Sequence, residues 1–385
     1  MIEEIQSAFR NKTVFITGHT GFKGSWLCLW LKQLGAQVVG YSLDPPTAPN
    51  NFTVSDISST LKRHIFADVR DSTQMQSAIL ETQPDYVLHM AAQTVVKAGY
   101  DRPKETFDVN VMGTASVLDA VAALDKPCSV VCITSDKCYA NDEGDGKRAF
   151  VESDPMGEFE PYGASKGCVE LLVKAYTHSF FHPDQIHQHG KSVATARAGN
   201  VVGGGDWTPH ALIPDLVRAA QSHTALELRN PDAIRPWQHV LQALSGYLLL
   251  AAKNSDQPGK YNGGWNFGPE QDNSLQVSEL SDEFFDAWGN GSWKECASLE
   301  RFHEARALSL SIGKASRQLD WTPTWDTRTT IRNTAGWYRS YFEGIEPRLI
   351  CEQQIAEFEQ AGIELQRFEI SSLRAPPAAA PGQSA

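Results

Sequence analysis

The chain has 385 residues, of which 41% are hydrophobic and 21% are charged, and its formal net charge is −12 at pH 7. This composition is typical of a folded globular protein and excludes a disordered or fibrous one. An acidic chain without a long basic run is a poor candidate for binding nucleic acid or an anionic membrane surface, although a local group of cations could still hold an anionic ligand.

Neither a membrane segment nor a metal site is expected. The densest early apolar run, residues 26–31, is far shorter than the about 20 residues that a membrane span needs. The N-terminal dozen residues lack the apolar stretch and cleavage site of a secretory signal. The seven cysteines are spread along the chain without the spacing of metal ligands. We therefore expect a cytoplasmic protein with reduced thiols.

The first half of the chain alternates short apolar strands with helical segments. The expected strands are 13–17, 37–41, 65–67, 86–90, 129–133 and 192–197, and the expected helices are 24–34, 72–82, 103–123 and 163–180. Continuous apolar strands separated by helices predict a parallel sheet covered on both faces. The predicted fold class is α/β, a doubly wound parallel sheet of the Rossmann type with a smaller C-terminal substrate-binding lobe.

The composition and the pattern of expected elements change after about residue 200, where loops rich in Gly, Pro and Trp join shorter helices. We expect a dinucleotide-binding domain over residues 1–200, with contributions from about 235–270. A discontinuous substrate-binding lobe should cover 201–345. Residues 346–385 should form a C-terminal helix and a disordered tail, because the last stretch is rich in Ala, Pro and Gly.

A glycine-rich loop follows the first strand and opens a helix, with Gly18, Gly21 and Gly24 in the pattern G-x-x-G-x-x-G. Glycines allow a tight turn and a close approach of the main chain to a pyrophosphate, which the helix N-terminus stabilises. At a strand–helix junction this pattern predicts dinucleotide binding. The residues predicted to bind the dinucleotide here are Gly18, Thr20, Gly21, Phe22, Lys23 and Gly24.

Residues after the second and third strands bear on which dinucleotide is bound. Asp44 could accept hydrogen bonds from the adenosine ribose, or it could be a turn residue before two prolines. Asp68 and Val69 could flank the adenine. The absence of an arginine after the second strand favours NAD over NADP, although Lys23 could meet a 2′-phosphate.

Tyr162 and Lys166 are candidates for proton transfer, because they lie one helical turn apart on the same face of a predicted helix. A nearby cation favours the phenolate, which can take a proton from an alcohol. Such pairs also occur by chance on solvated helix faces. The polar segment Thr134–Tyr139 makes the pair more specific, since it follows a parallel strand at the end where open α/β sheets bind ligands.

These motifs together resemble the extended short-chain dehydrogenase/reductases that act on nucleotide sugars. The glycine loop, His89–Ala92, Asn110–Thr114, Ser135 and the tyrosine–lysine pair occur in that family's order. The chain is also similar, over about residues 10–340, to the 4,6-dehydratase branch that acts on CDP-glucose. The segments that carry this narrower resemblance are Thr134–Tyr139, Tyr162–Cys168, Ala196–Trp207 and Arg235–Val240.

The resemblance implies a catalytic set. Ser135 and Tyr162 would handle the C4 oxygen of the hexose, and Lys166 would orient the cofactor ribose. Oxidation at C4 acidifies the C5 proton, so Lys137 would remove that proton while Asp136 protonates the leaving C6 hydroxyl. For these tasks Lys137 must be neutral and Asp136 must hold a proton. The hydride then returns to C6, which makes the expected enzyme an NAD-dependent lyase.

The resemblance also implies binding residues. The cofactor would be NAD, and the residues added to the glycine loop and the tyrosine–lysine pair are Ala91, Ala92 and Asn110. Asn200 would hydrogen-bond the diphosphate of the substrate, and Arg235 would pair with phosphate, which a guanidinium can do bidentately. His303 and Arg306 lie where the family contacts the nucleotide.

The expected reaction converts CDP-D-glucose to CDP-4-dehydro-6-deoxy-D-glucose, in deoxysugar biosynthesis of the O-antigen or lipopolysaccharide type. Two alternatives stay open. An epimerase or reductase of the same fold would not need Asp136 and Lys137 at this strand end, and a non-catalytic NAD-binding sensor would need no proton-transfer set. The family commonly dimerises through helices near 103–123 and 163–180, so the resemblance implies a homodimer or a dimer of dimers. Residues 140–146 depart from the family's pattern.

Overall fold

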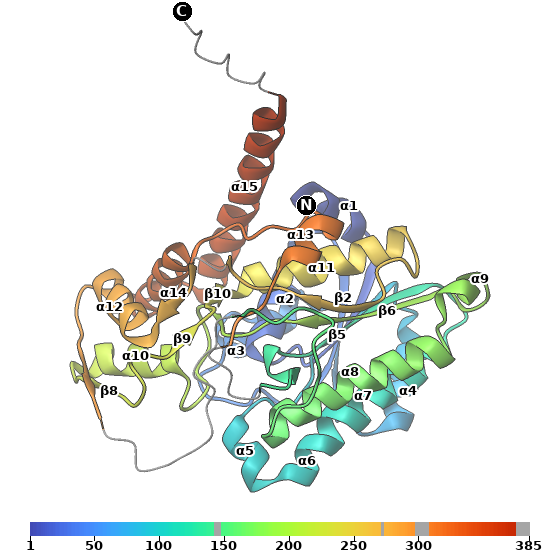
Figure 1. Ribbon diagram of the computed structural model, residues 1–385, viewed down its shortest axis with the longest axis horizontal. Coiled ribbons are helices and arrows are strands. Elements are labelled where there is room, and N and C mark those ends of the chain that lie inside the picture. The colour runs from blue at the N-terminus through green and yellow to red at the C-terminus, as the bar shows by residue number, and fades with distance from the viewer. Residues whose placement is uncertain (142–147, 271–272, 297–307, 375–385) are drawn as a thin grey trace, which may run out of the picture.

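The computed structural model describes residues 1–141, 148–270, 273–296 and 308–374, with the main chain alone for 369–374 (Figure 1). Its centre is a seven-stranded sheet in which every pairing is parallel. In spatial order the strands are β11 (Gly263–Asn266), β6 (Lys191–Arg197), β5 (Cys128–Ile133), β4 (Tyr86–His89), β1 (Thr13–Thr17), β2 (Gln37–Ser42) and β3 (Arg63–Phe66). This order confirms the predicted doubly wound sheet, with its switch point between β1 and β4, where such sheets bind ligands.

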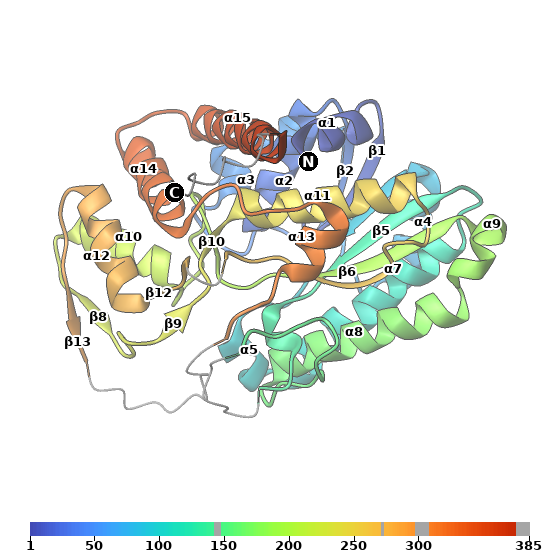
Figure 2. The same cartoon turned by 45° about the horizontal axis from the view of Figure 1, so that its top comes forward.

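Helices cover both faces of the sheet, as its continuous apolar strands require (Figure 2). One face packs against α4 (Ser72–Thr82), α7 (Gly113–Ala122) and α8 (Pro161–Ser179). The other face packs against α1 (Ile2–Phe9), α2 (Phe22–Gln33), α11 (Val240–Asp256) and α15 (Pro347–Arg374). Each layer has its own apolar core, and the strand side chains alternate between the two.

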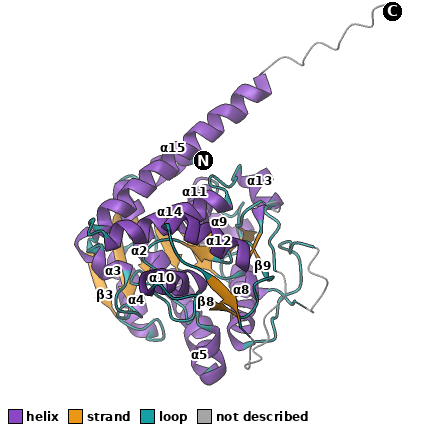
Figure 3. Ribbon diagram, turned by 90° about the vertical axis from the view of Figure 1, so that its left-hand side faces the viewer, coloured by secondary structure: helices purple, strands orange, loops and turns teal. Residues whose placement is uncertain are grey.

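The C-terminal part of the chain adds helices and short strand pairs beside the sheet, on the side that Figure 3 faces. Its longer helices are α10 (Leu212–Ser222), α12 (Val277–Trp288) and α14 (Thr327–Phe342). Its strand pairs are β7 (Val201–Val202) with β10 (Gln238–His239), β8 (Leu226–Leu228) with β13 (Trp293–Glu295), and β9 (Ile234–Arg235) with β12 (Leu275–Gln276). The remaining short helices are α3 (Asn51–Val54), η1 (Ile57–Thr60), α5 (Val96–Asp101), α6 (Pro103–Phe107), η2 (Asp108–Met112), η3 (Asp136–Cys138), η4 (Pro183–Gln185), α9 (Ile186–His189) and α13 (Gly313–Leu319).

The predicted helix over 103–123 is not continuous. α6 ends at Phe107, α7 begins at Gly113, and the π-helical turn η2 lies between them. A π turn is weaker than an α turn and often occurs at functional sites. The buried Asn110 belongs to η2 and bonds to the loop after β4 and to α8, which compensates for the irregular turn. The periodic sequence gave no sign of this interruption.

Two elements were not predicted from the sequence. The seventh strand, β11, has the sequence GGWN, without a β-branched residue, and it is a strand because it pairs with β6 at the edge of the sheet. The N-terminal helix α1 buries Ile2, Ile5 and Phe9 against the core. Across the described parts of the chain, no helix combines the length and the apolar character that crossing a membrane requires.

Candidate active site

A cavity of about 830 Å³ lies at the carboxyl ends of the central strands. Three groups of predicted residues line it. The glycine loop and Asp68 form part of the wall, Ser135, Asp136 and Tyr162 form another part, and Asn200 and Arg235 belong to a third. Tertiary structure therefore brings the predicted cofactor, catalytic and substrate residues to one cavity. The fold thus joins segments that are almost 220 positions apart in the sequence, as Gly18 and Arg235 are.

The glycine loop makes a close main-chain turn between β1 and α2. Gly18 has φ +74°, and a Cβ added there would lie 2.7 Å from the main-chain nitrogen of Ala91. A Cβ on Gly24 would lie 2.3 Å from the carbonyl oxygen of Gly18. Gly21 is the N-cap of α2, which begins at Phe22 rather than at residue 24 as expected. The positive end of a helix therefore meets the cavity through a main-chain cradle, which fits a pyrophosphate.

The residues predicted to lie near the adenosine also line the cavity. Asp44 is exposed just after β2, and Thr20 ties the glycine loop to this strand end by donating from Oγ1 to the carbonyl oxygen of Leu43 at 2.9 Å. Asp68 accepts two hydrogen bonds of 3.0 Å from Nε of Arg70, and this contact holds the pKa of Asp68 below its usual range. The geometry suits both readings of Asp44, as a ribose acceptor and as a turn residue.

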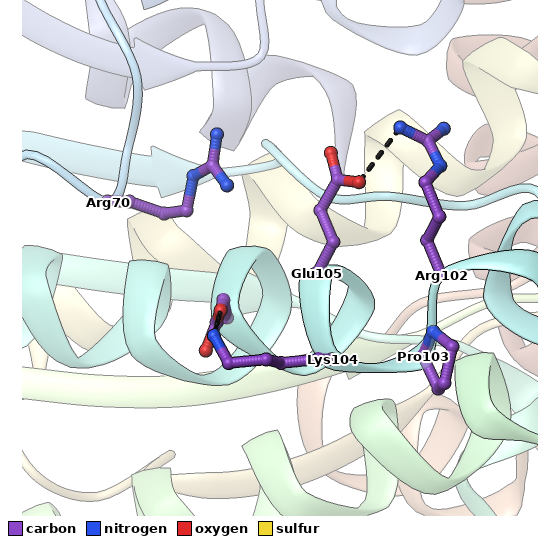
Figure 4. Close-up of a pocket in the computed structure, with 6 residues that line it drawn as sticks. Arg70, Arg102, Pro103, Lys104 and Glu105 are labelled. Atoms are coloured by element: carbon purple, nitrogen blue, oxygen red, sulfur yellow. Dashed lines mark hydrogen bonds and ion pairs between the residues drawn. The ribbon is translucent and has the colours of Figure 1, made fainter.

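A smaller hollow of about 420 Å³ shares Arg70 and Glu105 with the main cavity. Arg102 contacts Glu105 at 2.8 Å, the pair joined by a dashed line in Figure 4, and Lys104 contacts Asp108 at 2.5 Å. Asp68 neutralises Arg70 in the same way. The charges of this hollow are therefore compensated within the chain.

Asn110 lies behind the cavity wall. Its Oδ1 accepts from the main-chain nitrogen of Gln93 at 2.8 Å, and its Nδ2 donates to the carbonyl oxygen of Gln93 at 3.0 Å and to Oγ of Ser165 at 2.8 Å. Ala91 and Ala92 line the cavity, but Asn110 does not. Asn110 thus joins the loop after β4 to α8, and its predicted contact with the cofactor stays a prediction.

Ser135 and Asp136 lie at the end of β5. Ser135 is the N-cap of η3, and its Oγ accepts from the main-chain nitrogen of Lys137 at 3.2 Å. The same hydroxyl donates to Oδ1 of Asp136 at 2.9 Å. Burial raises the pKa of Asp136, although the hydrogen bond from Ser135 and the charges of Lys137 and Arg235 oppose the rise. The environment thus favours the protonated carboxyl that the predicted acid needs.

Lys137 follows on the same 3₁₀ turn, is half-buried and lines the cavity. Its carbonyl oxygen lies against Gly163 of α8, where an added Cβ would be only 2.5 Å away. The close approach of this turn to α8 brings the Asp136–Lys137 pair next to Tyr162, as the sequence predicted.

Tyr162 and Lys166 occupy the first turns of α8. Glu160 caps this helix by accepting from the main-chain nitrogens of Tyr162 at 2.8 Å and Gly163 at 2.7 Å. Burial raises the pKa of Tyr162, and a hydrogen bond with the hydroxyl of Ser135 opposes the rise. Nζ of Lys166 donates to the carbonyl oxygen of Ile133 at 3.0 Å, and Lys166 does not itself line the cavity.

The buried Lys166 and the half-buried Lys23 are two cations near the predicted catalytic residues. Burial and then the charge of Lys23 lower the pKa of Lys166 to about 8. Burial also lowers the pKa of Lys23 to about 8, against the attraction of Asp136. Nζ of Lys23 lies 5.8 Å from the centre of the Tyr247 ring. Lys23 therefore faces the catalytic residues, which the loop motif alone could not indicate.

Tyr247, from α11, was missed by sequence reasoning. Its hydroxyl is buried without a hydrogen-bond partner among the described residues, and the charges of Tyr162 and Asp136 act on it. No motif surrounds it in the sequence, so only the packing of α11 against the sheet identifies it.

A buried ion pair lies behind the catalytic residues. Glu170, one turn after Lys166 on α8, accepts from Nε of Arg197 at 2.9 Å and from a terminal nitrogen of Arg197 at 2.7 Å. The same carboxylate accepts from the hydroxyls of Thr134 at 2.5 Å and Thr195 at 2.7 Å. One side chain thus joins α8 to the ends of β5 and β6, and these bonds hold the pKa of Glu170 below its usual value despite burial.

Asn200 and Arg235 occupy the part of the wall contributed by the C-terminal half of the chain. Asn200 has φ +46°, a conformation that Asn tolerates better than most residues. Arg235, in β9, is buried rather than on the surface, and one of its terminal nitrogens donates to the carbonyl oxygen of Ile234 at 2.9 Å. Both line the cavity, as predicted for residues that meet a diphosphate.

Asp206 and Thr208 also line this part of the cavity and were not predicted as site residues. Oγ1 of Thr208 donates to Oδ1 of Asp206 at 2.6 Å, and burial raises the pKa of Asp206. The neighbouring Trp207 packs against Trp337 with ring centres 5.7 Å apart.

Two predicted substrate residues, His303 and Arg306, lie outside the described residues, as do residues 142–147 of the divergent loop. Within the described residues, no group of three or more His, Cys, Asp or Glu side chains could hold a metal ion.

Comparisons with known proteins place the chain in a family. The model of the NAD dependent epimerase/dehydratase family matches residues 14–264. The CDP-glucose 4,6-dehydratase of Salmonella typhimurium is 42% identical over 354 residues, which cover 92% of this chain and 98% of that protein.

Solved structures share the fold. A dTDP-glucose 4,6-dehydratase of Streptomyces venezuelae, with NAD and TYD bound, has a TM-score of 0.71 at 24% identity and covers 87% of this chain and 99% of its own. A UDP-glucose 4-epimerase of Stenotrophomonas maltophila, with bound NAD, has a TM-score of 0.73 at 24% identity over 86% of this chain and 99% of its own. The chain belongs to the NAD dependent epimerase/dehydratase family.

Proposed function

We propose that the chain is an NAD-dependent CDP-glucose 4,6-dehydratase, a lyase that forms CDP-4-dehydro-6-deoxy-D-glucose for deoxysugar biosynthesis. The observation that carries the proposal is one cavity wall holding Ser135 and Tyr162 beside Asp136 and Lys137. The first two suit oxidation of an alcohol, and the second two suit removal of water. The relative of Salmonella typhimurium, named as a CDP-glucose 4,6-dehydratase, supports the choice of nucleotide and sugar.

The residues present fit NAD. The cradle of Gly18–Gly24 at the start of α2 would hold the pyrophosphate, Asp44 the adenosine ribose, and Asp68 with Val69 the adenine edge. When bound, NAD would supply a reversible hydride acceptor, which removes hydride from C4 and returns it to C6. NADP is the less favoured cofactor. Lys23 was the candidate partner for its 2′-phosphate, and Lys23 instead faces Asp136 and Tyr247.

Proton transfer at C4 would fall to Tyr162, with Ser135 bonded to the same sugar oxygen. Burial alone would keep the phenol protonated, because it raises the pKa of Tyr162. The ammonium of Lys166, one turn further along α8, would supply the cation that favours the phenolate. Lys166 holds its charge up to about pH 8, where its pKa lies. Tyr162 thus takes the C4 hydroxyl proton as the ketone forms.

Water loss would use the adjacent pair. Lys137, as the base, takes the proton from C5, and Asp136 gives its proton to the C6 oxygen. The C5–H and C6–O bonds break, a C5–C6 double bond forms, and the hydroxyl leaves as water. When hydride arrives at C6, Lys137 returns the proton to C5. The proton that Tyr162 gained matches the one that Asp136 lost, so exchange with solvent resets both groups and the net change is loss of one water.

The substrate's diphosphate would lie between Asn200 and Arg235. A buried guanidinium can donate two hydrogen bonds to one phosphate group, and bulk water does not screen its charge. An epimerase of the same fold would have no use for an acid and a base at residues 136 and 137. A sensor would have no use for Ser135 and Tyr162. The position of all four on the cavity supports the dehydratase over both.

A direct experiment tests the activity. The purified chain is incubated with NAD and separately with CDP-, dTDP-, UDP- and GDP-glucose, and each sugar nucleotide is weighed by mass spectrometry. We expect loss of one water from CDP-glucose at the highest rate. Water loss from another sugar nucleotide alone would contradict the choice of nucleotide. An isomer of unchanged mass, or no reaction with any of the four, would contradict the dehydratase assignment.

Three further expectations belong to this proposal. Residues 1–200 with about 235–270 would form the cofactor domain, and 201–345 the substrate lobe. Two copies would associate through the segment 103–123 and α8, where Met112 at the end of η2 and Leu171 on α8 are 57% and 59% exposed. The enzyme would work in the cytoplasm, where NAD and nucleotide sugars are made.

A further inference from the structure

We infer that Gly199 is a positioning residue for the dehydration step, because its missing side chain leaves the space that the carboxyl of Asp136 occupies. This inference rests on the proposed function and adds a residue that the catalytic motifs do not contain. Gly199 lines the cavity between the end of β6 and Asn200. Its φ lies outside the left-handed region, so its backbone conformation does not call for glycine.

The space beside Gly199 is already taken. A Cβ built on Gly199 would lie 1.7 Å from Oδ2, 2.2 Å from Cγ and 2.8 Å from Oδ1 of Asp136. All three nearest atoms belong to the same carboxyl group. Such distances are far below van der Waals contact, so a side chain at 199 and the present position of Asp136 exclude each other.

Hydrogen bonds from Gln238 hold the main chain at Gly199 in place. The buried Gln238 donates through Nε2 to the carbonyl oxygen of Gly199 at 3.2 Å and to that of Phe267 at 3.0 Å. The main-chain nitrogen of Gln238 also donates to the carbonyl oxygen of Asn200 at 3.2 Å. These bonds fix residues 199 and 200 against β10. The carboxyl of Asp136, at the tip of a side chain with two rotatable bonds, is the part that would move.

The contact bears on the acid's chemistry as well as its position. Oδ1 of Asp136 accepts from Ser135, and Oδ2 is the carboxyl atom nearest to the position that a Cβ of Gly199 would take. Burial of Asp136 is the main cause of its raised pKa, and a raised pKa favours the proton that the acid would donate. The titratable and charged groups that face the carboxyl are Lys137 on η3, Arg235 on β9, Lys23 on α2, Tyr162 on α8 and Tyr247 on α11.

The test is Gly199→Ala, assayed with CDP-glucose and NAD. Because a displacement of about 1 Å can cost about 100-fold in rate, we expect water loss to slow about 100-fold. Oxidation at C4, followed by NADH absorbance after rapid mixing, should stay within about twofold of the parent, since the three atoms nearest to the added Cβ all belong to Asp136 and none to Ser135 or Tyr162. Water loss should also fall off at a lower pH than in the parent, because a carboxyl displaced toward solvent loses its proton earlier.

Two further variants separate positioning from general damage. Gly268→Ala is the matched control, since its added Cβ would lie 3.8 Å from Leu310, an ordinary contact, and we expect parental rates. In an Asp136→Ala background, Gly199→Ala should cause no further loss, because the carboxyl is gone. If Gly199→Ala alone does not fold, recovery of folding in the double variant supports the contact, and continued misfolding contradicts it.

The outcomes distinguish this inference from the proposed function. Parental water loss by Gly199→Ala, or an equal additional loss in the Asp136→Ala background, overturns the role of Gly199. A parent enzyme that removes no water from any sugar nucleotide overturns the proposed function instead.

Discussion

The two regions of the cavity that we propose hold the cofactor and the substrate nucleotide, called here the cofactor end and the nucleotide end, are built in different ways. The cofactor end, formed by the glycine loop and residues such as Asp44, Asp68 and Ala91, comes from consecutive strand–helix junctions of β1 to β4. The nucleotide end, formed by Asn200, Asp206 and Arg235 with their neighbours, comes from short strand pairs whose partners are distant in sequence. The first is shaped by main-chain turns and the second by side chains that tertiary packing places.

This difference has a functional meaning. A main-chain cradle suits a cofactor shared by many relatives, since it depends on glycine spacing and helix direction rather than on particular side chains. Side chains on separate loops can change singly, so the nucleotide end can acquire a new preference without disturbing the cofactor. Each of the following experiments asks whether the two ends are as separate as this comparison implies, and whether the catalytic residues between them act in the proposed steps.

The largest effect is expected for Lys137→Ala, at the junction of the two ends. Removing the base should slow water loss from CDP-glucose by about 10²–10⁴-fold, while oxidation at C4 continues. NADH absorbance after rapid mixing follows the first step, and mass spectrometry follows the second. Normal dehydration by this variant would refute the assigned base, and loss of both steps together would mean that Lys137 also holds the substrate.

Arg235→Lys should weaken the binding of CDP and leave the binding of NAD unchanged. A hydrogen bond to a charged group contributes about 1.5–3 kcal/mol, so losing the bidentate contact should raise the Kd of CDP by about 10- to 100-fold. Calorimetry with CDP and, separately, with NAD measures the two ends. The exposed Arg229→Lys should bind both as the parent does. Weaker NAD binding in Arg235→Lys would break the proposed separation.

Lys166→Met should stabilise the chain without cofactor, with a gain that depends on pH. Burial lowers the pKa of Lys166 to about 8, from 10.5 in an exposed lysine. Below pH 8 the buried charge carries its full cost. Between pH 8 and 10.5 Lys166 is protonated in the unfolded chain but neutral in the folded one. The contribution of Lys166 to the free energy of unfolding therefore rises with pH over this range. The free energy of unfolding of Lys166→Met should exceed that of the parent by about 3 kcal/mol at most below pH 8, and the difference should disappear near pH 10.5.

Urea unfolding at a series of pH values measures this gain as the difference between variant and parent. Lys174→Met, on the exposed side of the same helix, is the control and should show no pH-dependent difference. A gain for Lys166→Met that is constant over this pH range would mean that lost charge burial is not its cause.

Asp44→Asn is expected to have the smallest effect, and it decides between the two readings of this residue. If Asp44 accepts from the ribose, the Kd of NAD should rise about tenfold, which corresponds to about 1.4 kcal/mol. CDP binding should stay unchanged. Unaltered NAD binding would identify Asp44 as a turn residue, and Asp101→Asn, exposed on α5, serves as the control.

Much of the cofactor end could be predicted from the sequence, because its signals are local. The glycine spacing, the strands 13–17 and 86–90 and the Tyr162–Lys166 pair each depend on neighbouring residues, and the structure places them as expected. Helix boundaries were less exact, since α2 begins two residues early and η2 divides the third predicted helix.

The rest depended on contacts that no local pattern contains. The orientation of Lys23 toward Asp136, the buried hydroxyl of Tyr247 and the space beside Gly199 arise only when α2, α11 and the end of β6 come together. Asp206 was not among the predicted site residues, and packing places it on the cavity. Resemblance to a family supplied the roles of Asp136 and Lys137, which spacing alone would not have assigned.

The carboxylate of Glu170 has a consequence for how such enzymes diversify. Because one anion clamps the helix bearing Tyr162 to two strand ends, that helix cannot slide to accommodate a new reaction. A new reaction is then reached by substituting the few side chains that lie just beyond those strand ends, while the backbone that carries them stays in place.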